Sequence, residues 1–424
     1  MNKKRKSEII LSAKNINTGF ISGNSFVSIN KDISFDLYSG QILVIIGESG
    51  SGKSVLSKSF GGMNDESFFF SSGSLKYFKD KKPIELVDIF NSSNSGYYSK
   101  KMKKIYKNKL NKLSEEINVK NQDKNQNIVE LNFLKNDYLQ LNNEYINFGK
   151  TTKKYSKHDA SKLIRKIRGK EISYVFQDPA LALNPLLTVG QQITEVLKIH
   201  RNLKGKEAYN EAINLLQKVG IINPEKAIKM LPSEYSGGMR QRIVIAIALA
   251  SNPKILIADE PTTALDVTIQ KQIIQLLLNL KRELNIAIIF ITHDLGVVAE
   301  IANSICVMYN GTFIEKGTKK DIFLNPKHPY TWALISSIPQ FSKKTDNLFY
   351  LKGSPLPSNF SIDYDPFAPR NENALKIDFQ YFPPTFKISS THFVKSWLYS
   401  KYSPAFEIPK TVSDAISYLK GVIK

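Results

Sequence analysis

The sequence has very little cysteine and arginine, and it has no long apolar run. Cys306 is the only cysteine among the 424 residues, which excludes an intramolecular disulfide and any metal or iron–sulfur site built from several thiolates of this chain. The longest apolar stretches, such as Ile243–Ala250, are far shorter than the ~20 residues that a membrane-spanning helix needs. The basic start, residues 1–6, precedes no sustained apolar region of the kind a signal peptide has. We therefore expect a cytosolic chain that does not span a bilayer.

Acidic residues are scarce relative to basic ones, with 38 Asp+Glu against 59 Lys+Arg and a formal net charge of +21. Such a charge fits nucleic-acid binding, attachment to an anionic membrane surface, or compositional bias alone. Lysine outnumbers arginine 51 to 8, although arginine is preferred for bidentate contacts with phosphates and bases. Residues 100–170 hold 19 basic and 7 acidic side chains, so 19 − 7 = +12 of the +21 lies in this segment.

The order of apolar runs predicts an α/β fold. Residues 8–46 indicate short β segments that end in the apolar run 42–46, which fits a buried parallel strand, and residues 68–90 are again strand-like. From 171 onward strands alternate with helices, which predicts a parallel, doubly wound sheet. The strands are expected at 171–176, 255–258, 287–291 and 305–309, and the helical segments at 189–220, 238–250, 268–283 and 295–302. The last hundred residues have Pro-rich turns and no such alternation.

The segment 92–164 is rich in lysine and asparagine and carries two apolar stripes at helical spacing. One stripe runs from Met102 to Ile117 and the other from Ile128 to Tyr145, with the polar stretch 121–127 between them. Two amphipathic helices folded against each other would bury both stripes. A disordered, low-complexity loop is the alternative. Because its composition differs from its surroundings, we expect residues 95–160 to be removable without loss of folding.

Residues 47–54 fit the pattern G-x-x-x-x-G-K-[ST] directly after an apolar strand. Backbone N–H groups of such a loop, and the start of the helix that follows, bind phosphate oxygens. Lys53 would neutralise the β- and γ-phosphates, and the hydroxyl of Ser54 would ligate Mg²⁺. The remaining residues of this nucleotide-binding loop are Gly47, Glu48, Ser49, Gly50, Ser51 and Gly52.

Two further motifs lie later in the chain. The apolar strand 255–258 delivers Asp259 and Glu260 at its carboxyl end, where Asp259 would hold Mg²⁺ and Glu260 would act as a general base on water. By themselves they could be solvated carboxylates. Ser236, Gly237 and Gly238 open a helix, where their backbone could bind a second phosphate group or simply cap the helix.

The order of the phosphate loop, Gln177, the Ser-Gly-Gly-Met sequence at 236–239, Asp259-Glu260 and His293 resembles that of ATP-binding cassette (ABC) ATPases. The resemblance covers nearly the whole chain except 92–164. It implies a P-loop ABC ATPase cassette, an α/β fold with a helical subdomain, that binds ATP and Mg²⁺. It also implies that two cassettes pack head to tail, each ATP lying between the phosphate loop of one and the signature serine, here Ser236, of the other.

Other roles are implied only by this resemblance. Gln177 would sense Mg²⁺ and the γ-phosphate, His293 would contact the γ-phosphate, and Asp266 would lie in the loop that connects the two ATP sites. Phe20 resembles the aromatic residue that stacks on adenine, although a single phenylalanine in a strand is equally a core residue. The implied catalytic residues are thus Glu260, His293 and Gln177, and the implied metal ligands are Ser54, Gln177 and Asp259.

Within the ABC proteins, the chain resembles the ATP-binding subunits of oligopeptide/dipeptide importers, closest to the D-type subunit. The motif 177–185, residues 259–268 and 292–298, and Asn325–Thr331 with Gly353–Pro357 carry this resemblance. It implies as partners a second, paralogous ATP-binding subunit, two membrane-spanning permease subunits and an extracytoplasmic peptide-binding protein, with no nucleic acid. The chain would be peripheral, on the cytoplasmic face of the membrane.

Two departures from that family stand out. Many relatives have cysteines of an iron–sulfur cluster where this chain has Asp365 and Asn371, so we expect no cluster. The other departure is the insertion. We therefore expect cassette parts at 1–91 and 165–318 with a helical subdomain at about 178–235, an inserted helical hairpin at 92–164, and a C-terminal extension at 319–424. A DNA-repair ATPase with a coiled-coil hairpin is a rival function, but such an ATPase has no need of the C-terminal extension. A translation-factor cassette is a second rival, but it normally has two phosphate loops in one chain, and this sequence has one.

Overall fold

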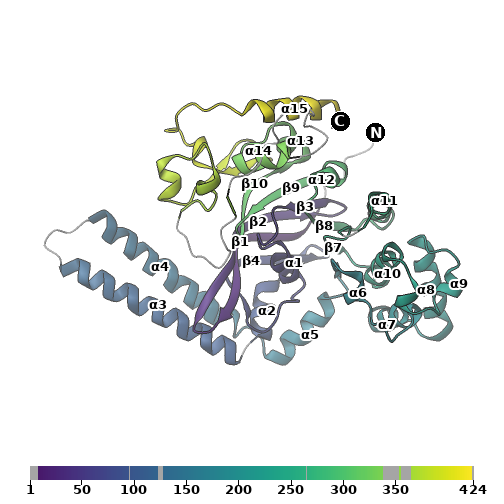
Figure 1. Ribbon diagram of the computed structural model, residues 1–424. Helices are drawn as coiled ribbons and strands as arrows, with labels where there is room; N and C mark the ends of the chain where they lie inside the picture. The colour runs from purple at the N-terminus through teal and green to yellow at the C-terminus, as the bar shows by residue number, and fades with distance from the viewer. Residues whose placement is uncertain are drawn as a thin grey trace. The chain divides into compact units, whose positions relative to one another are not determined.

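The computed structural model describes residues 8–94, 96–122, 128–263, 265–337, 353–354 and 364–422 (Figure 1). The chain forms two compact units. The first consists of residues 1–9, 37–57 and 166–424, and the second of residues 10–36 and 58–165. Some residues that the sequence analysis named lie outside the described residues. They are 123–127 of the polar stretch 121–127, Ala264, and residues 355–357.

An eight-stranded sheet forms the centre of the first unit in the described part of the chain, in the order β11-β12-β10-β9-β3-β8-β7-β6. The strands from β9 to β6 pair in parallel, which confirms the doubly wound sheet expected from the sequence. All side chains of β3, β7 and β8 are buried, as expected for strands covered on both faces. The parallel strands are β3 (Ile42–Ile46), β6 (Ile172–Val175), β7 (Ile255–Asp259), β8 (Ala287–Thr292) and β9 (Ser304–Tyr309).

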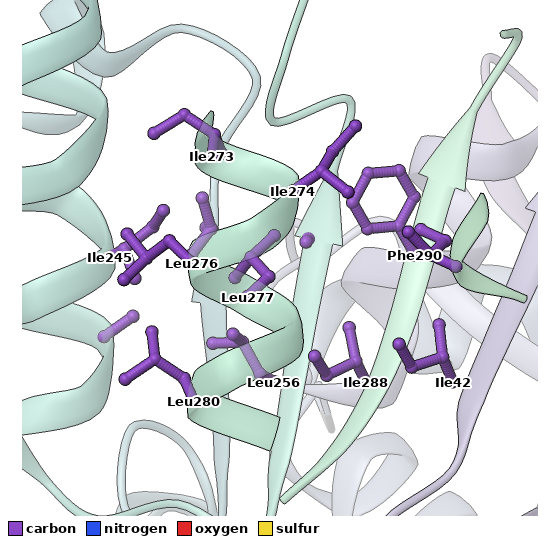
Figure 2. Packing of buried hydrophobic residues seen from close by; sticks show 14 of the residues in the cluster. Ile42, Ile245, Leu256, Ile273, Ile274, Leu276, Leu277, Leu280, Ile288 and Phe290 are labelled. Atoms are coloured by element: carbon purple, nitrogen blue, oxygen red, sulfur yellow. The ribbon is translucent and has the colours of Figure 1, made fainter. Parts of the chain in front are cut away.

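Helix α11 (Val267–Leu284) covers one face of this sheet, as Figure 2 shows. Its apolar side chains recur every three or four residues, so Ile273, Leu277 and Leu280 share one stripe. They belong to the same buried cluster as Leu256 of β7 and Ile288 of β8. Full burial of each such side chain stabilises the fold by roughly 1.5–3 kcal/mol, which holds the parallel strands and their carboxyl ends in place.

The other helices of this unit have the following bounds: α6 (Pro179–Ala182), α7 (Val189–Arg201), α8 (Gly205–Lys218), α9 (Pro224–Ala227), α10 (Gly237–Ala250), α12 (Leu295–Ile301), α13 (Lys319–Leu324), α14 (Pro329–Ser336) and α15 (Lys410–Val422). Short 3₁₀ turns occur at Pro232–Glu234, Ala368–Arg370, Lys376–Phe379 and Trp397–Tyr399. None of the helices in the described ranges is both long enough and apolar enough to cross a membrane.

The end of the chain joins the same sheet. Strand β10 (Thr312–Thr318) pairs antiparallel with β9, and β12 (Phe393–Lys395) and β11 (Thr385–Lys387) extend that antiparallel edge. The sequence analysis found no alternation of strands and helices in the last hundred residues and did not identify β11 and β12, because they are too short to leave a periodic pattern. Cys306 lies in β9, the strand predicted at 305–309, and its side chain is fully buried.

The second unit contains a sheet in the order β2-β1-β4-β5. Strands β1 (Ile9–Ser22) and β2 (Ser25–Tyr38) each have 14 residues, so the expectation of short segments over 8–46 was wrong; long strands with mixed burial have too little alternation to be recognised. Strands β4 (Phe68–Lys79) and β5 (Lys82–Glu85) follow, but Leu86–Ser93 forms helix α2 where the aromatic composition indicated strand. Helix α1 (Lys53–Phe60) begins in the first unit and ends in this one.

Two long helices occupy the inserted segment, α3 (Tyr97–Gln122) and α4 (Ile128–Thr151), with α5 (Lys157–Ile167) after them. Tyr106 of α3 contacts the rings of Tyr145 and Phe148 of α4, so apolar side chains of the two helices face each other. Figure 1 shows the two helices as a hairpin. The base of this hairpin also packs on the sheet: Phe148 lies edge-on to Phe69, 5.3 Å between ring centroids. The hairpin is therefore anchored in the core of the second unit.

Candidate functional site

The loop 47–54 connects the central strand β3 to α1 at the carboxyl end of the sheet. Gly47 has no room for a side chain, because a Cβ there would lie 2.2 Å from the carbonyl oxygen of Met308. Gly50 and Gly52 adopt φ of +78° and +96°, which only glycine tolerates well. The glycines thus allow a tight loop that ends at a helix N-terminus, a favourable place for an anion.

Lys53 folds back over this loop. Its Nζ donates to the carbonyl oxygens of Gly47 at 2.8 Å and Glu48 at 2.7 Å, and its side chain is buried. Burial lowers the pKa of this ammonium group from its ordinary value, while the carboxylates of Glu260, Asp259 and Glu48 oppose the shift. These interactions hold a positive charge in the loop.

Asp259, at the end of β7, is surrounded by hydroxyl groups. Ser54 Oγ donates to its Oδ1 at 3.2 Å, and Tyr174 Oη donates to its Oδ2 at 2.5 Å. Ser57 Oγ bridges the same Oδ2 at 3.4 Å and the hydroxyl of Tyr174 at 2.8 Å. Burial, together with the neighbouring Asp259 carboxylate, raises the pKa of Tyr174, so its hydroxyl keeps its proton and remains a donor.

The sequence analysis placed Ser54 and Asp259 together but missed Tyr174 and Ser57. Tyr174 lies on β6 three residues before Gln177, and Ser57 lies one turn after Ser54 on the same face of α1. The helical spacing could have indicated Ser57. No local pattern indicates Tyr174, because its contact depends on the pairing of β6 with β7.

Glu260 lies at the centre of a second group of polar side chains. Its backbone φ is +46°, an uncommon conformation for a residue with a side chain. Its carboxylate accepts from Gln177 Nε2 at 3.1 Å and from Thr263 Oγ1 at 3.0 Å, and Nδ1 of His293 lies 3.4 Å from its Oε1. Three predicted residues from the ends of three parallel strands thus come together, and Gln177 and His293 are exposed to solvent.

The remaining predicted residues lie elsewhere. Ser236 caps α10, its Oγ accepting from the N–H of Met239, and Gly237 and Gly238 form the first turn. Asp266 caps α11 in the same way through the N–H of Ile269. Phe20 is part of β1 in the second unit, where its ring lies edge-on to Phe68 at 5.4 Å. The contacts of Ser236, Asp266 and Phe20 do not test the roles that the resemblance implies for them, so these roles stay predictions.

A residue of the C-terminal extension also contacts the loop. Arg370 Nη1 and Nη2 donate to the two carboxylate oxygens of Glu48 at 2.9 and 3.2 Å, and the N–H of Glu48 donates to the hydroxyl of Tyr330 at 2.9 Å. The sequence analysis predicted neither contact, since the residues are far apart along the chain.

Asp365 and Asn371, the positions on which the sequence analysis based its expectation of no cluster, stabilise turns. The Oδ1 of Asp365 accepts from the N–H of Phe367 at 2.9 Å, and the Oδ1 of Asn371 accepts from the N–H of Asn373 at 3.0 Å. Aspartate and asparagine commonly close a turn in this way. Side-chain oxygens of this chain therefore fix the backbone at both positions.

Two family models match the chain. The model described as ABC transporter matches residues 30–145 and 139–263, and the model described as oligopeptide/dipeptide transporter, C-terminal region, matches residues 314–374. The first covers the phosphate loop, Gln177, the Ser-Gly-Gly turn and both carboxylates of 259–260. The second includes both Tyr330 and Arg370.

Curated relatives agree with these models. The oligopeptide transport ATP-binding protein OppD of Bacillus subtilis is 51% identical over 254 residues, which is 60% of this chain and 71% of the relative. The oligopeptide transport ATP-binding protein AmiE of Streptococcus pneumoniae is 37% identical over 97% of this chain and 95% of its own length. The dipeptide transport ATP-binding protein DppD of Lactococcus lactis is 38% identical over 94% of this chain and 93% of its own.

Proposed function

The chain belongs to the oligopeptide/dipeptide branch of ABC transporter ATP-binding proteins, and on that basis we propose that it is the ATP-hydrolysing motor subunit of a peptide importer. The observation that supports this most directly is the meeting of Glu260, Gln177 and His293 beside a lysine-containing phosphate loop. The loop with Lys53 can bind phosphates, and the group around Glu260 can activate water.

In this proposal ATP lies along residues 47–54. Lys53, which bonds only loop carbonyl and hydroxyl oxygens in the described contacts, exchanges them for the β- and γ-phosphate oxygens. Ser54, Asp259 and Gln177 offer the hard oxygen ligands that suit Mg²⁺, and a bound Mg²⁺ would neutralise charge on the phosphates. Tyr174 and Ser57 orient the Asp259 carboxylate for this purpose.

Glu260 acts as the general base. Its side chain accepts hydrogen bonds from Gln177 and Thr263, which hold the carboxylate at the carboxyl end of the sheet. A carboxylate placed there can accept a proton from the water that attacks the γ-phosphate, a contribution of about 10²–10⁴ in rate. His293 contacts the same carboxylate and would also reach the γ-phosphate.

Head-to-tail dimerisation would complete the site. Ser236, Gly237 and Gly238 present a hydroxyl and free backbone N–H groups at the start of α10, suited to the γ-phosphate bound by a partner cassette. Asp266 would connect the two sites, and Phe20 would stack on adenine. The partner is a paralogous ATP-binding subunit, and the two cassettes act on permease subunits that receive peptide from an extracytoplasmic binding protein, at the cytoplasmic face of the membrane.

The Glu260→Gln variant tests this assignment. The amide keeps the shape of the side chain but accepts protons poorly, so the variant should bind ATP and hydrolyse it at least 100-fold more slowly, within the ~10²–10⁴ range of general-base catalysis. ATP affinity and phosphate release measured on the full chain give the two values. The matched control, Lys53→Ala, should instead lose ATP binding. Wild-type turnover in Glu260→Gln would contradict the general-base role, and unchanged ATP affinity in Lys53→Ala would contradict the phosphate loop.

A further inference from the structure

The contact between Arg370 and Glu48 joins the C-terminal extension to the phosphate loop within the first unit. The guanidinium group forms a bidentate pair with the carboxylate, the geometry in which arginine and carboxylate bind most strongly. The Arg370 side chain is only 6% exposed, and that of Glu48 is 26% exposed. A pair so shielded from water is weakened little by salt.

Aromatic rings hold Arg370 in place. Its guanidinium carbon lies 5.9 Å from the centre of the Tyr309 ring, and its Nη1 donates to the Tyr309 hydroxyl at 3.2 Å. Phe367, three residues earlier, contacts the rings of both Tyr309 and Tyr330 at 5.3 and 5.6 Å. Tyr330 in turn accepts the hydrogen bond of the Glu48 N–H. Strand β9, helix α14 and the turn at 367–370 thus fix both the backbone and the charge of Glu48.

Glu48 is an unfavourable residue for a loop that binds a polyanion. Glu48 is part of the loop itself, and its carbonyl oxygen accepts from Lys53 Nζ at 2.7 Å, so its negative charge also acts on a phosphate bound there. Pairing with Arg370 cancels this negative charge. Without the arginine, the carboxylate would repel each charge of bound ATP across a partly buried region, where screening is weak.

We propose that Arg370 is a positioning residue for ATP: the C-terminal extension supplies the positive charge that neutralises Glu48 in the phosphate loop and so raises the affinity of the loop for nucleotide. The inference rests on the proposed phosphate-binding role of residues 47–54. The extension therefore contributes to nucleotide binding in its own chain.

A double-mutant cycle tests this. ATP affinity, KM and kcat are measured on the full chain for wild type, Arg370→Ala, Glu48→Gln and the double variant. Arg370→Ala should bind ATP about tenfold more weakly, equivalent to ~1.4 kcal/mol, with kcat at saturating ATP changed less than about twofold. Glu48→Gln, which removes the negative charge and keeps Arg370, should bind ATP more tightly than wild type. The double variant should recover most of the affinity that Arg370→Ala loses, because no carboxylate remains to repel ATP.

Two further variants separate this role from a merely structural one. Lys376→Ala removes one positive charge from an exposed position of the same extension and should leave ATP affinity unchanged. Arg370→Lys keeps the charge and should retain most of the affinity. Arg370→Gln, which removes the charge but keeps a long polar side chain, replaces Arg370→Ala in the cycle if the alanine variant does not fold.

The inference would be overturned if Arg370→Ala bound ATP like wild type, if Glu48→Gln bound it more weakly, or if the double variant were as weak as Arg370→Ala alone. Failure of the proposed function is distinguishable, because it would appear as unchanged ATP binding in Lys53→Ala, a variant that leaves the Arg370–Glu48 pair intact.

Discussion

At the scale of single residues, the site depends on side chains that the sequence motifs do not contain. Tyr174 donates a short hydrogen bond to a buried carboxylate whose other partners are serine hydroxyls. Hydrogen bonds to charged groups contribute about 1.5–3 kcal/mol, and a buried carboxylate that loses a donor cannot regain it from water. Tyr174 is thus as much a part of the site as the residues of the motifs.

The Tyr174→Phe variant should therefore unfold at lower urea concentration, with a loss of roughly 1.5–3 kcal/mol in the free energy of unfolding. Its ring stays packed against Phe176, 4.6 Å away, so the change isolates the hydroxyl. The Mg²⁺ concentration needed for half-maximal ATPase activity should rise as well. Tyr402→Phe, at an 83% exposed position, is the control and should change neither value. Equal stability of the two variants would show that Tyr174 does not hold Asp259.

At the scale of elements, the C-terminal extension contains a buried aspartate, Asp365. The Asp365 carboxyl is buried, and burial raises its pKa to about 7, with the nearby Asp378 adding to the shift. In the unfolded chain an aspartate titrates near 3.9. Between about pH 4 and pH 7 the folded state therefore holds a proton that the unfolded state releases, and the free energy of unfolding falls as the pH rises through this range.

Asp365→Asn removes this dependence, because the amide is neutral at every pH and keeps the oxygen that accepts from the Phe367 N–H. The variant should be more stable than wild type at pH 8, by up to roughly 4 kcal/mol, and the difference should shrink to about 1.5 kcal/mol at pH 5. Urea unfolding at the two pH values measures both differences. Asp414→Asn, at an exposed position of α15, should show the same difference from wild type at both. A constant difference for Asp365→Asn would refute the shift.

The hairpin of α3 and α4 has two parts with different roles. Its base, around Met102, Tyr106 and Phe148, belongs to a buried cluster with Phe69 of the sheet. Among the described residues of its outer part, Val119, Ile128 and Leu139 are all more than half exposed. The expectation that residues 95–160 can be removed without loss of folding overlooked this base, since composition does not reveal packing.

Replacing residues 114–137 by a short Gly/Ser linker should therefore keep the fold and the ATPase activity. The unfolding temperature should change by about 3 °C or less, corresponding to less than ~1 kcal/mol. Removing 95–160 uncovers Phe69 and should cost roughly 3–5 kcal/mol, the range for loss of a large buried side chain. Thermal unfolding and phosphate release of the two variants measure this contrast. Equal stability of both would mean that the base of the hairpin contributes nothing to the core.

At the scale of the whole molecule, the net charge of +21 is unevenly spread and does not by itself identify a partner. The family to which the chain belongs implies membrane permease subunits as partners. A basic surface binds nucleic acid in a strongly salt-dependent way, whereas a specific subunit interface with an apolar core tolerates salt better.

Purification of the tagged full chain from detergent-extracted membranes at physiological salt separates the two kinds of partner. Two permease subunits, a second ATP-binding subunit and a peptide-binding protein should copurify, and they should remain bound at salt concentrations that remove nucleic acid. A preparation containing nucleic acid and no membrane protein would contradict the importer assignment. Lys53→Ala serves as a control variant, because loss of ATP binding should not prevent it from assembling with the permease subunits.

The sequence by itself determined the parallel strands of the cassette, the phosphate loop and the pair Asp259-Glu260, because each depends on a short stretch whose periodicity or glycine content is visible locally. The shared role of Glu260, Gln177 and His293 was implied only by the resemblance to ABC ATPases, and the structure brings the three side chains together. Only the tertiary structure decided that Tyr174 holds Asp259, that the hairpin base belongs to a core, and that Arg370 pairs with Glu48 322 positions away. Contacts at such separation leave no local pattern, because the chain must fold before the two side chains meet.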